Sequence, residues 1–160
     1  METQVAIIGA GPAGSLLALL LHRAGIDSIV VERQSRDYVL ARIRAGVLEN
    51  GTVELLRSAG VGDRLDAEGH VHTHTGIAYG AEHLFYFDIG KHAGSQFVAY
   101  GQTEIQRDLY DALDAAGVPV LFETADVEIH DPTGDRPSIT GTQGGEAVRI
   151  EANQVIGCDG

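Results

Sequence analysis

Three glycines near the N-terminus have the spacing of a dinucleotide-binding loop. Gly9, Gly11 and Gly14 form the pattern G-x-G-x-x-G, and the acidic residue Glu32 follows 18 residues after the last of them. In such a loop the first glycine permits a tight turn, the second lets a pyrophosphate approach the backbone, and the third lets a helix pack closely on a strand. The N-terminus of that helix attracts phosphate. A carboxylate at Glu32 suits a ribose diol and repels a 2′-phosphate, so the pattern predicts FAD or NAD in this site and not NADP.

The residues around this pattern predict the elements that it requires. Val5–Ile8 is a short apolar run typical of a buried strand, Pro12–Ala24 reads as a helix with proline in its first turn, and Ser28–Glu32 as a second strand. A strand, a glycine turn, a helix and a second strand within about thirty residues make the βαβ unit of a parallel sheet. This context makes the glycine pattern far more specific than a glycine-rich hexamer alone.

The rest of the chain predicts further helices and an antiparallel β-meander. Helical spacing of apolar residues occurs at residues 51–59 and 104–116, and Gly117 and Pro119 end the second helix. Strands are predicted at residues 77–81, 84–89, 120–122, 127–130, 138–142, 147–150 and 155–157. We therefore predict an α/β fold, a Rossmann-like domain with a parallel sheet and an antiparallel β-meander.

Composition and charge exclude several classes of protein. The 160 residues have a net charge of −12 and are 44% hydrophobic, which indicates one globular domain and argues against nucleic-acid binding. One cysteine, Cys158, allows neither an intrachain disulfide nor a four-cysteine zinc site. The apolar stretch Ser15–Leu21 follows no basic residue and is too short to span a bilayer, so neither a signal peptide nor a membrane span is predicted. We expect a cytoplasmic protein.

Basic charge is concentrated near the N-terminus. Residues 1–64 contain seven arginines and seven acidic residues, whereas residues 65–160 carry the whole net charge of −12. Four of the arginines fall between Arg33 and Arg44. A basic cluster in an acidic protein suits an anionic ligand. The alternative is a set of charges on a solvated loop, which is the interpretation we prefer for Arg36.

Residues 32–49 carry a more specific pattern, which includes the segment Arg42-x-Arg44-Ala45-Gly46. This stretch resembles the 4-hydroxybenzoate 3-monooxygenase family of class A flavoprotein aromatic hydroxylases. Residues 4–9, 100–104 and 157–160 are similar to that family as well, so the resemblance covers the whole chain. It implies that residues 1–160 form an FAD/NAD(P)-binding domain.

The resemblance implies a role for individual residues in FAD binding. Glu32 holds the adenosine ribose of FAD, and Arg44 and Gln102 contact the phosphate and ribityl region. The residues implied to lie beside the isoalloxazine ring are Ala45, Gly46 and Val47. Asp159 and Gly160 match the D-G motif that the family uses for both FAD and NADPH.

The family has no separate NADPH domain and takes up NADPH on the surface of its FAD domain. Positions that match those implicated in NADPH binding are Arg33, Gln34, Tyr38, Arg42 and Arg44. Arginine suits this role because its guanidinium binds phosphate oxygens in a bidentate manner.

Three histidines alternate along one segment. His70, His72 and His74 would share one face of a strand, which is compatible with a metal site, but no acidic or cysteine cluster completes it and we predict no metal. By resemblance, His72 passes the phenolic proton of the substrate to solvent, a task for which a near-neutral pKa is suitable.

The same resemblance implies a reaction and a larger protein. NADPH reduces FAD, the reduced flavin captures O2 as a C4a-hydroperoxide, and 4-hydroxybenzoate is hydroxylated ortho to its hydroxyl group. Family members are roughly twice as long or longer, and their residues for the aromatic acid lie beyond position 160. We therefore expect an N-terminal fragment that lacks most of the substrate domain, is inactive alone and exposes apolar surface. The complete enzyme is expected to form a homodimer.

Two other classes of function stay open at this point. One is a stand-alone dinucleotide-binding module without catalytic activity. The other is a fragment of an NAD-dependent dehydrogenase, in which the Arg42-x-Arg44-Ala45-Gly46 segment has no role.

Overall fold

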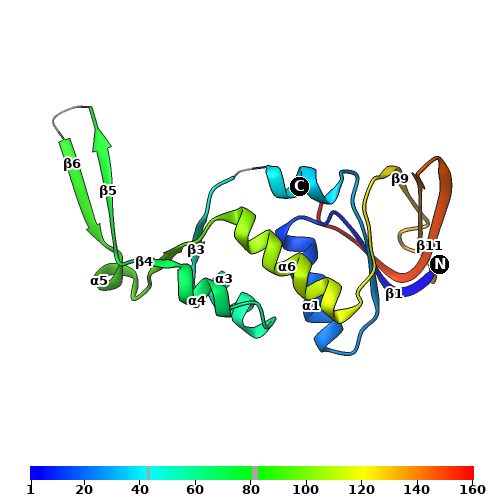
Figure 1. Ribbon diagram of the computed structural model, residues 1–160, viewed down its shortest axis with the longest axis horizontal. Coiled ribbons are helices and arrows are strands. Elements are labelled where there is room, and N and C mark those ends of the chain that lie inside the picture. The colour runs from blue at the N-terminus through cyan, green and yellow to red at the C-terminus, as the bar shows by residue number, and fades with distance from the viewer. Residues whose placement is uncertain (43, 81–82) are drawn as a thin grey trace. The chain divides into compact units, whose positions relative to one another are not determined.

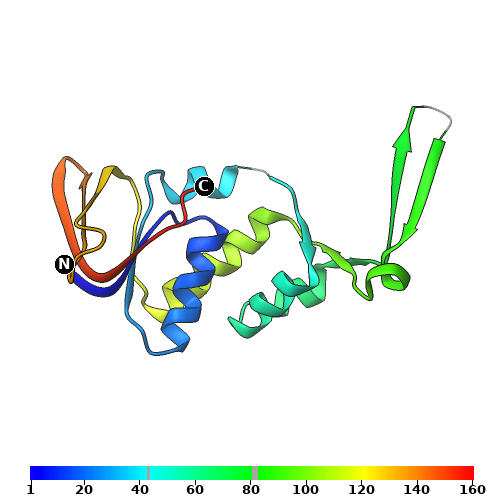
Figure 2. The same cartoon turned by 180° about the vertical axis from the view of Figure 1, so that it is seen from behind.

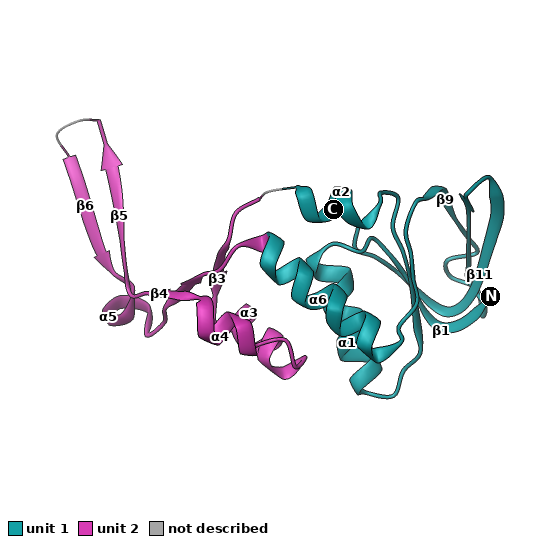
Figure 3. Ribbon diagram, in the orientation of Figure 1, with its two compact units in different colours: residues 1–43, 103–160 teal, residues 44–102 magenta. Residues whose placement is uncertain are grey.

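The computed structural model describes residues 1–42, 44–80 and 83–160, drawn as a ribbon in Figure 1. The chain divides into two compact units, one of residues 1–43 and 103–160 and the other of residues 44–102 (Figure 3). We call them unit 1 and unit 2. Ile43, within the segment that carries the family resemblance, and Ala81, at the end of a predicted strand, lie outside the described residues.

Unit 1 is built on a six-stranded sheet in the order β8-β2-β1-β11-β10-β9. The strands are β1 (Glu2–Ile8), β2 (Ser28–Val31), β8 (Val120–Leu121), β9 (Thr124–His130), β10 (Ser138–Gln143) and β11 (Glu146–Gly157). β8, β2, β1 and β11 run parallel to one another, whereas β10 and β9 continue the sheet as an antiparallel meander. The predicted α/β class, with a parallel sheet and a meander, is confirmed.

β11 corrects one sequence-based expectation. Residues 147–150 and 155–157 were expected as two strands because polar residues separate their apolar runs, but they belong to one strand of 12 residues. Its first half pairs with β10, and its second half pairs with β1 from Glu151 onward. The polar stretch stays part of the strand because β1 replaces β10 as the hydrogen-bonded neighbour from Glu151 onward.

Three helices accompany this sheet. They are α1 (Pro12–Arg23), α2 (Arg36–Ala41) and α6 (Gln102–Ala116). The glycine after α6, Gly117, has a φ of +69° and stops the helix as the sequence indicated. The sequence-based prediction omitted α2. Its signal was present, because the Ser35 hydroxyl accepts a hydrogen bond from the Tyr38 N–H at 3.2 Å and so caps the first turn.

The side chains of the sheet alternate between two buried faces. Ala6, Ile29, Val31, Ile139 and Ile150 form one apolar cluster. Ile7 and Val30 pair across β1 and β2 at the intervening positions and are fully buried on the opposite face. α1 packs on β1 and β2, and α6 lies beside α1 (Figures 1 and 2).

Unit 2 contains a three-stranded sheet, a separate hairpin and three short helices. The sheet has the order β3-β7-β4, and the hairpin pairs β5 with β6. The bounds are β3 (Val47–Glu49), α3 (Asn50–Ser58), α4 (Asp63–Glu68), β4 (His70–His72), β5 (His74–Tyr79), β6 (His83–Asp88), α5 (Ile89–Ala93) and β7 (Phe97–Ala99). The predicted strand pair corresponds to β5 and β6. β5 begins three residues earlier than predicted, at His74, and ends at Tyr79, and Ile89 begins α5 instead of ending β6.

The β5–β6 hairpin exposes large apolar side chains (green in Figure 2). Its members at 45% exposure or more are Ile77, Tyr79, Leu84, Phe85, Tyr86 and Phe87. They lie on both faces of the hairpin, because successive side chains of a strand point to opposite sides. These exposed side chains belong to the hairpin, and the apolar sheet surface expected from the missing substrate domain stays a prediction.

Across the described ranges of the chain, none of the helices has both the length and the apolar composition that a membrane span requires.

Candidate functional site

The predicted dinucleotide site lies where three parallel strands end. β1 is flanked by β2 and β11, with Ile8 opposite both Val31 and Gly157. Gly9 and Glu32 follow directly after β1 and β2, and Asp159 is the second residue after β11. In an open parallel sheet, ligands bind at the carboxyl ends of the strands. The binding place lies between neighbouring strands whose following connections go to opposite faces of the sheet. The structure therefore brings together residues that are 150 positions apart at the place where a dinucleotide is expected.

Gly9 and Gly14 lie where no side chain fits. Gly9 has a φ of +104°, and a Cβ on it would lie 2.6 Å from the Cys158 carbonyl oxygen. A Cβ on Gly14 would overlap the carbonyl oxygen of Gly9. The first and third glycines thus have the roles that the pattern predicts, a tight turn and a close approach of α1 to the end of β1.

Gly11 differs from both. A Cβ on it would meet no atom within 4 Å, and its φ of −69° is open to any residue. The protein itself therefore does not require glycine here. Among the described residues, no side chain caps α1, which begins with Pro12, and the first-turn N–H groups have no acceptor within the helix. An open space beside an uncapped helix N-terminus fits a pyrophosphate.

Glu32 is half-buried and bonded to two backbone groups. Its Oε2 accepts a hydrogen bond from the Ala10 N–H at 2.9 Å, and its Oε1 accepts one from the Gln34 N–H at 2.9 Å. These contacts fix the carboxylate beside the glycine loop. A carboxylate has about four acceptor positions, so two hydrogen bonds leave capacity for the two hydroxyls of a ribose.

The D-G motif, Asp159-Gly160, lies at the same edge of the sheet, beside Gly9. The Cα of Asp159 would lie 2.9 Å from a Cβ on Gly9, and the Cys158 N–H donates to the Ile8 carbonyl at 2.7 Å. Asp159 and Gly160 are exposed, whereas Cys158 is partly buried. Burial, together with the charge of Asp159, raises the pKa of the Cys158 thiol.

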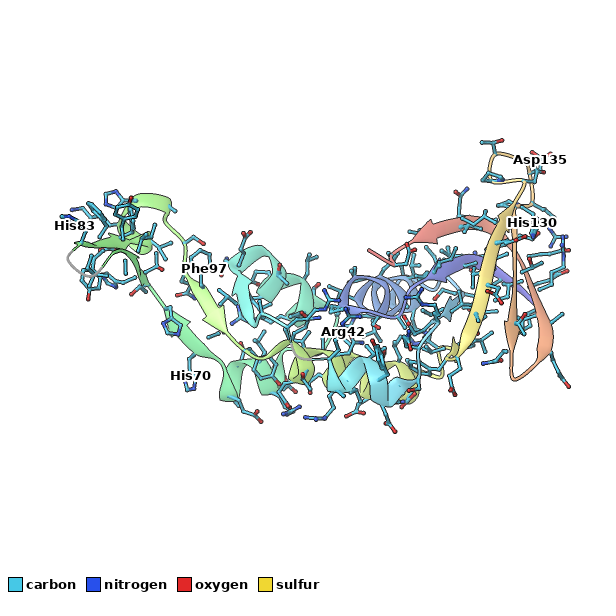
Figure 4. The ribbon with its side chains drawn as sticks, turned by 90° about the horizontal axis from the view of Figure 1, so that it is seen from above. Arg42, His70, His83, Phe97, His130 and Asp135 are labelled. Carbon is cyan, nitrogen blue, oxygen red and sulfur yellow. The ribbon has the colours of Figure 1, made fainter. Side chains whose placement is uncertain are left out.

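The arginines of the basic cluster fall into two groups. Arg36, expected as a solvated charge, instead donates to Asp114 at 2.6 Å and Asp111 at 3.4 Å, and its guanidinium lies 5.0 Å from the centre of the Tyr110 ring. That expectation was wrong because α2 places Arg36 against α6. Arg42, which is labelled in Figure 4, is exposed, and so is Arg33; within the described residues neither forms an ion pair.

The two other predicted NADPH contacts lie on the same stretch. Gln34 is partly buried, and its carbonyl accepts a hydrogen bond from the Glu123 N–H at 3.2 Å. Tyr38 is 47% exposed on α2.

Unit 2 holds the other predicted flavin contacts. A Cβ on Gly46 would lie 2.8 Å from both the Tyr100 carbonyl oxygen and the Gly101 Cα, and the Tyr100 N–H donates to the Gly46 carbonyl at 2.8 Å. Arg44 and Ala45, which precede β3, and Val47, which begins it, are exposed. Gln102, partly buried, follows Gly101 and begins α6.

The three histidines lie on two different strands. His72 is exposed on β4 opposite Phe97 of β7, a strand pair seen with His70 and Phe97 labelled in Figure 4. His74 begins β5, with its Nε2 3.6 Å from Asp88, a partner that the sequence-based interpretation missed. Among the residues that the structure describes, no three His, Cys, Asp or Glu side chains are grouped as metal ligands.

The glycine loop also has contacts that the sequence did not indicate. The Ala10 carbonyl accepts hydrogen bonds from Ser15, Gln106 and Tyr110. Only the helical pattern of α6 was evident in the sequence, and apolar periodicity does not identify which polar side chains are buried.

Comparison with known families decides between the possible dinucleotides. The family model described as "FAD binding domain" matches residues 2–160. The chain belongs to this family. Its dinucleotide is therefore FAD, and the dehydrogenase alternative, which places NAD in the same loop, is not favoured.

Proteins similar to this FAD-binding domain include aromatic hydroxylases. The chain is 44% identical over its full length to p-hydroxybenzoate hydroxylase of Acinetobacter baylyi, of which it spans 39%. It is 34% identical over 57% of its length to phenol 2-monooxygenase of a Pseudomonas species, of which the match spans 15%. The fold matches p-nitrophenol 4-monooxygenase of Pseudomonas putida with a TM-score of 0.82 and 20% identity, covering 99% of this chain and 41% of that one.

Substitution of single glycines separates the role of Gly11 from that of Gly14. We expect Gly11→Ala to keep the unfolding midpoint of the chain while FAD binding weakens about tenfold or more, because the added methyl group occupies only the space assigned to the pyrophosphate. Gly14→Ala forces α1 away from β1, so we expect both the stability and the FAD affinity to fall. Thermal unfolding and flavin-fluorescence titration measure the two quantities.

Gly25→Ala provides the matched control, since Gly25 also has open space around it but lies at the opposite end of α1. It has a φ of +73°, so alanine there costs stability without affecting FAD. Parental FAD affinity in Gly11→Ala would show that the pyrophosphate does not approach the backbone at this glycine.

Proposed function

We propose that this chain is the FAD-binding part of an NADPH-dependent flavoprotein monooxygenase that hydroxylates 4-hydroxybenzoate. The ring would be hydroxylated ortho to the existing hydroxyl, giving 3,4-dihydroxybenzoate. The observation that carries the proposal is the similarity of the whole chain to p-hydroxybenzoate hydroxylase. Because the chain spans 39% of that relative, the activity is proposed for a protein that also includes the remaining part, and the 160 residues alone are proposed to bind FAD without turnover.

Residues of unit 1 would hold the adenosine and pyrophosphate parts of FAD. Glu32 accepts the ribose hydroxyls with the acceptor positions that Ala10 and Gln34 leave unused. The uncapped N-terminus of α1 donates N–H groups to the pyrophosphate beside Gly11. When bound, FAD supplies the transfer of electrons from NADPH to O2, which amino-acid side chains do not perform.

A second set of residues is proposed, from the family resemblance, for the other half of the cofactor. In this proposal Arg44 and Gln102 bind the phosphate and ribityl region, and the exposed segment Ala45–Val47 borders the isoalloxazine ring. The close packing of Gly46 on Tyr100 and Gly101 keeps this segment in a fixed conformation. Asp159, two residues after the end of β11, completes the proposed set.

NADPH would bind through the exposed arginines. Arg33 and Arg42 have no acidic partner within the described part of the chain, whereas Arg36 is already paired with two aspartates. A guanidinium without a protein partner is available to bind a 2′-phosphate in a bidentate manner. Glu32, which repels such a phosphate, lies in the FAD site, so the 2′-phosphate of NADPH would be bound by other residues than the ribose of FAD.

His72 would move the phenolic proton of the substrate. It is exposed on β4, so one side of its imidazole has access to solvent. A phenolate is a far better nucleophile than a phenol toward an electrophilic oxygen, and a general base that exchanges protons with water can form it.

A chimera tests the proposed activity. In this chimera the 160 residues replace the matched segment of the Acinetobacter hydroxylase. We expect it to oxidise NADPH in the presence of 4-hydroxybenzoate and to form 3,4-dihydroxybenzoate, measured by product chromatography. The 160 residues alone should retain FAD after desalting and form no product. A chimera that binds FAD but forms no 3,4-dihydroxybenzoate would argue against the proposed reaction.

Arg42→Ala tests the NADPH site in the same chimera. Removal of one charge-assisted contact to the 2′-phosphate should raise the KM for NADPH about tenfold, with the KM for NADH and the FAD affinity unchanged. Arg23→Ala is the control, because Arg23 has the same charge and is exposed at the far end of α1. Equal increases in the KM for NADPH and the KM for NADH would exclude a contact between Arg42 and the 2′-phosphate.

His72→Asn tests the proton transfer. We expect product formation to slow about tenfold or more at neutral pH, with FAD affinity unchanged, because asparagine cannot exchange the proton. Added imidazole should restore part of the rate. His74→Asn is the control, since His74 interacts with Asp88 instead. A parental rate in His72→Asn would remove His72 from the mechanism.

A further inference from the structure

The two peptide groups on either side of Ala10 are held from opposite directions. The N–H of Ala10 donates to the Glu32 carboxylate at 2.9 Å. Its carbonyl accepts from the Ser15 hydroxyl at 3.0 Å, the Gln106 amide at 3.1 Å and the Tyr110 hydroxyl at 2.9 Å. A carbonyl oxygen has two lone pairs, so three donors on one oxygen is an unusual concentration of hydrogen bonds.

Two of these donors come from α6, 96 and 100 residues away in sequence. Gln106 is 2% exposed and Tyr110 is 1% exposed, so both polar side chains are almost completely buried beneath the loop. Neither belongs to the βαβ unit that forms the glycine pattern. The loop therefore depends on a helix that lies outside that pattern.

The buried side chain of Gln106 lowers the folding stability, because one of its two polar atoms is unsatisfied within the part of the chain that the structure describes. Its Nε2 donates to the Ala10 carbonyl and to the Ser15 hydroxyl oxygen, whereas its buried Oε1 has no hydrogen-bond partner among the described residues. An apolar side chain of the same size would avoid this unsatisfied acceptor. The opposite amide orientation would direct Oε1 at the Ala10 carbonyl oxygen, so the orientation with two donated bonds is favoured.

Tyr110 is held as a hydrogen-bond donor. Burial and the nearby Glu32 charge raise the pKa of its hydroxyl well above the usual range, so the hydroxyl keeps its proton. Its ring packs edge-to-face on Phe122 with centroids 5.3 Å apart, and the Arg36 guanidinium lies 5.0 Å from its centre. These contacts fix the position of the hydroxyl beneath Ala10.

The direction of the Ala10 carbonyl determines the direction of the next N–H. In a planar trans peptide the C=O and the N–H point in opposite directions. The carbonyl of Ala10 points inward to Ser15, Gln106 and Tyr110, so the N–H of Gly11 in the same peptide points away from them. Gly11 is the residue beside which the space is open.

We propose that Gln106 and Tyr110 are positioning residues of the FAD site, which orient the Ala10–Gly11 peptide so that the Gly11 N–H donates to the FAD pyrophosphate. The inference rests on the FAD site described above and does not depend on the reaction or on the aromatic substrate. Neither side chain contacts the ligand, and both act through the Ala10 carbonyl.

Two substitutions with small changes in shape test this role in the 160-residue chain. Tyr110→Phe removes only the hydroxyl, and Gln106→Met removes the amide donors at nearly constant volume. We expect each to raise the Kd of FAD and of ADP about tenfold, while the Kd of adenosine, which lacks phosphate, stays within twofold of the parent. The double variant should fall short of the product of the two effects, because both donors share one acceptor.

A spectroscopic measurement reports on Gly11 itself. In the parent, ADP should shift the Gly11 amide proton in a ¹H–¹⁵N NMR spectrum, as a new hydrogen bond to phosphate requires. In Tyr110→Phe this shift should shrink. A side chain that served stability alone would leave it unchanged once ADP is saturating.

Gln143→Met is the matched control. Gln143 is a partly buried glutamine of unit 1, and its Nε2 donates to the Phe122 carbonyl at 2.8 Å away from the loop. The Gln143→Met substitution should lower the unfolding midpoint without changing the affinity for ADP. Parental FAD and ADP affinities in both Tyr110→Phe and Gln106→Met, or an equal loss in Gln143→Met, would overturn the proposal. A parent chain that binds neither FAD nor ADP would instead contradict the FAD site itself.

Discussion

At Gly9, two chain segments 149 residues apart approach so closely that only glycine fits between them. The carbonyl of Cys158 lies where a side chain of Gly9 would be, and the carbonyl of Gly9 lies where a side chain of Gly14 would be. Close backbone packing at this one place therefore fixes the end of β1, the start of α1 and the end of β11. Since β1 pairs with β2 on one side and β11 on the other, the turn is supported by both of its neighbours.

Hydrogen bonds around Ala10 restrict the conformation of this turn further. They join the glycine loop to the end of β2 through Glu32 and to α6 through Gln106 and Tyr110. Arg36 extends the connection, because it pairs with two aspartates of α6 and lies over the Tyr110 ring. Within one basic cluster, an arginine with a structural role thus lies beside Arg33 and Arg42, which are exposed to solvent.

Much of the site could be predicted from the sequence because its requirements are local. Gly9, Gly11, Gly14 and Glu32 belong to one βαβ unit, and steric exclusion at two of the glycines agrees with the roles that their spacing indicated. The family and the cofactor were also recognisable, because residues 32–49 carry a specific pattern. The individual contacts of Arg44, Gln102 and Asp159 with FAD stay predictions.

Other features depend on tertiary contacts and left little trace in the sequence. Strands of three residues, such as β3, β4 and β7, are too short to show a period of two. Arg36 was assigned to solvent because its acidic partners lie 75 and 78 residues further along the chain. Gln106 resembles any polar residue of an amphipathic helix, and only the structure shows that it is buried beneath Ala10.

The place of β11 in the sheet has a consequence for biosynthesis. β1, α1 and β2 are translated well before β11, whose end packs against Gly9. At about 5–20 residues per second, the interval between translation of β2 and completion of β11 is roughly 6–25 s. During that time the growing polypeptide has one edge of β1 without its final partner. The cofactor loop therefore reaches its final form only after β11 has emerged from the ribosome, so this loop can bind FAD in its final conformation only after β11 has paired with β1.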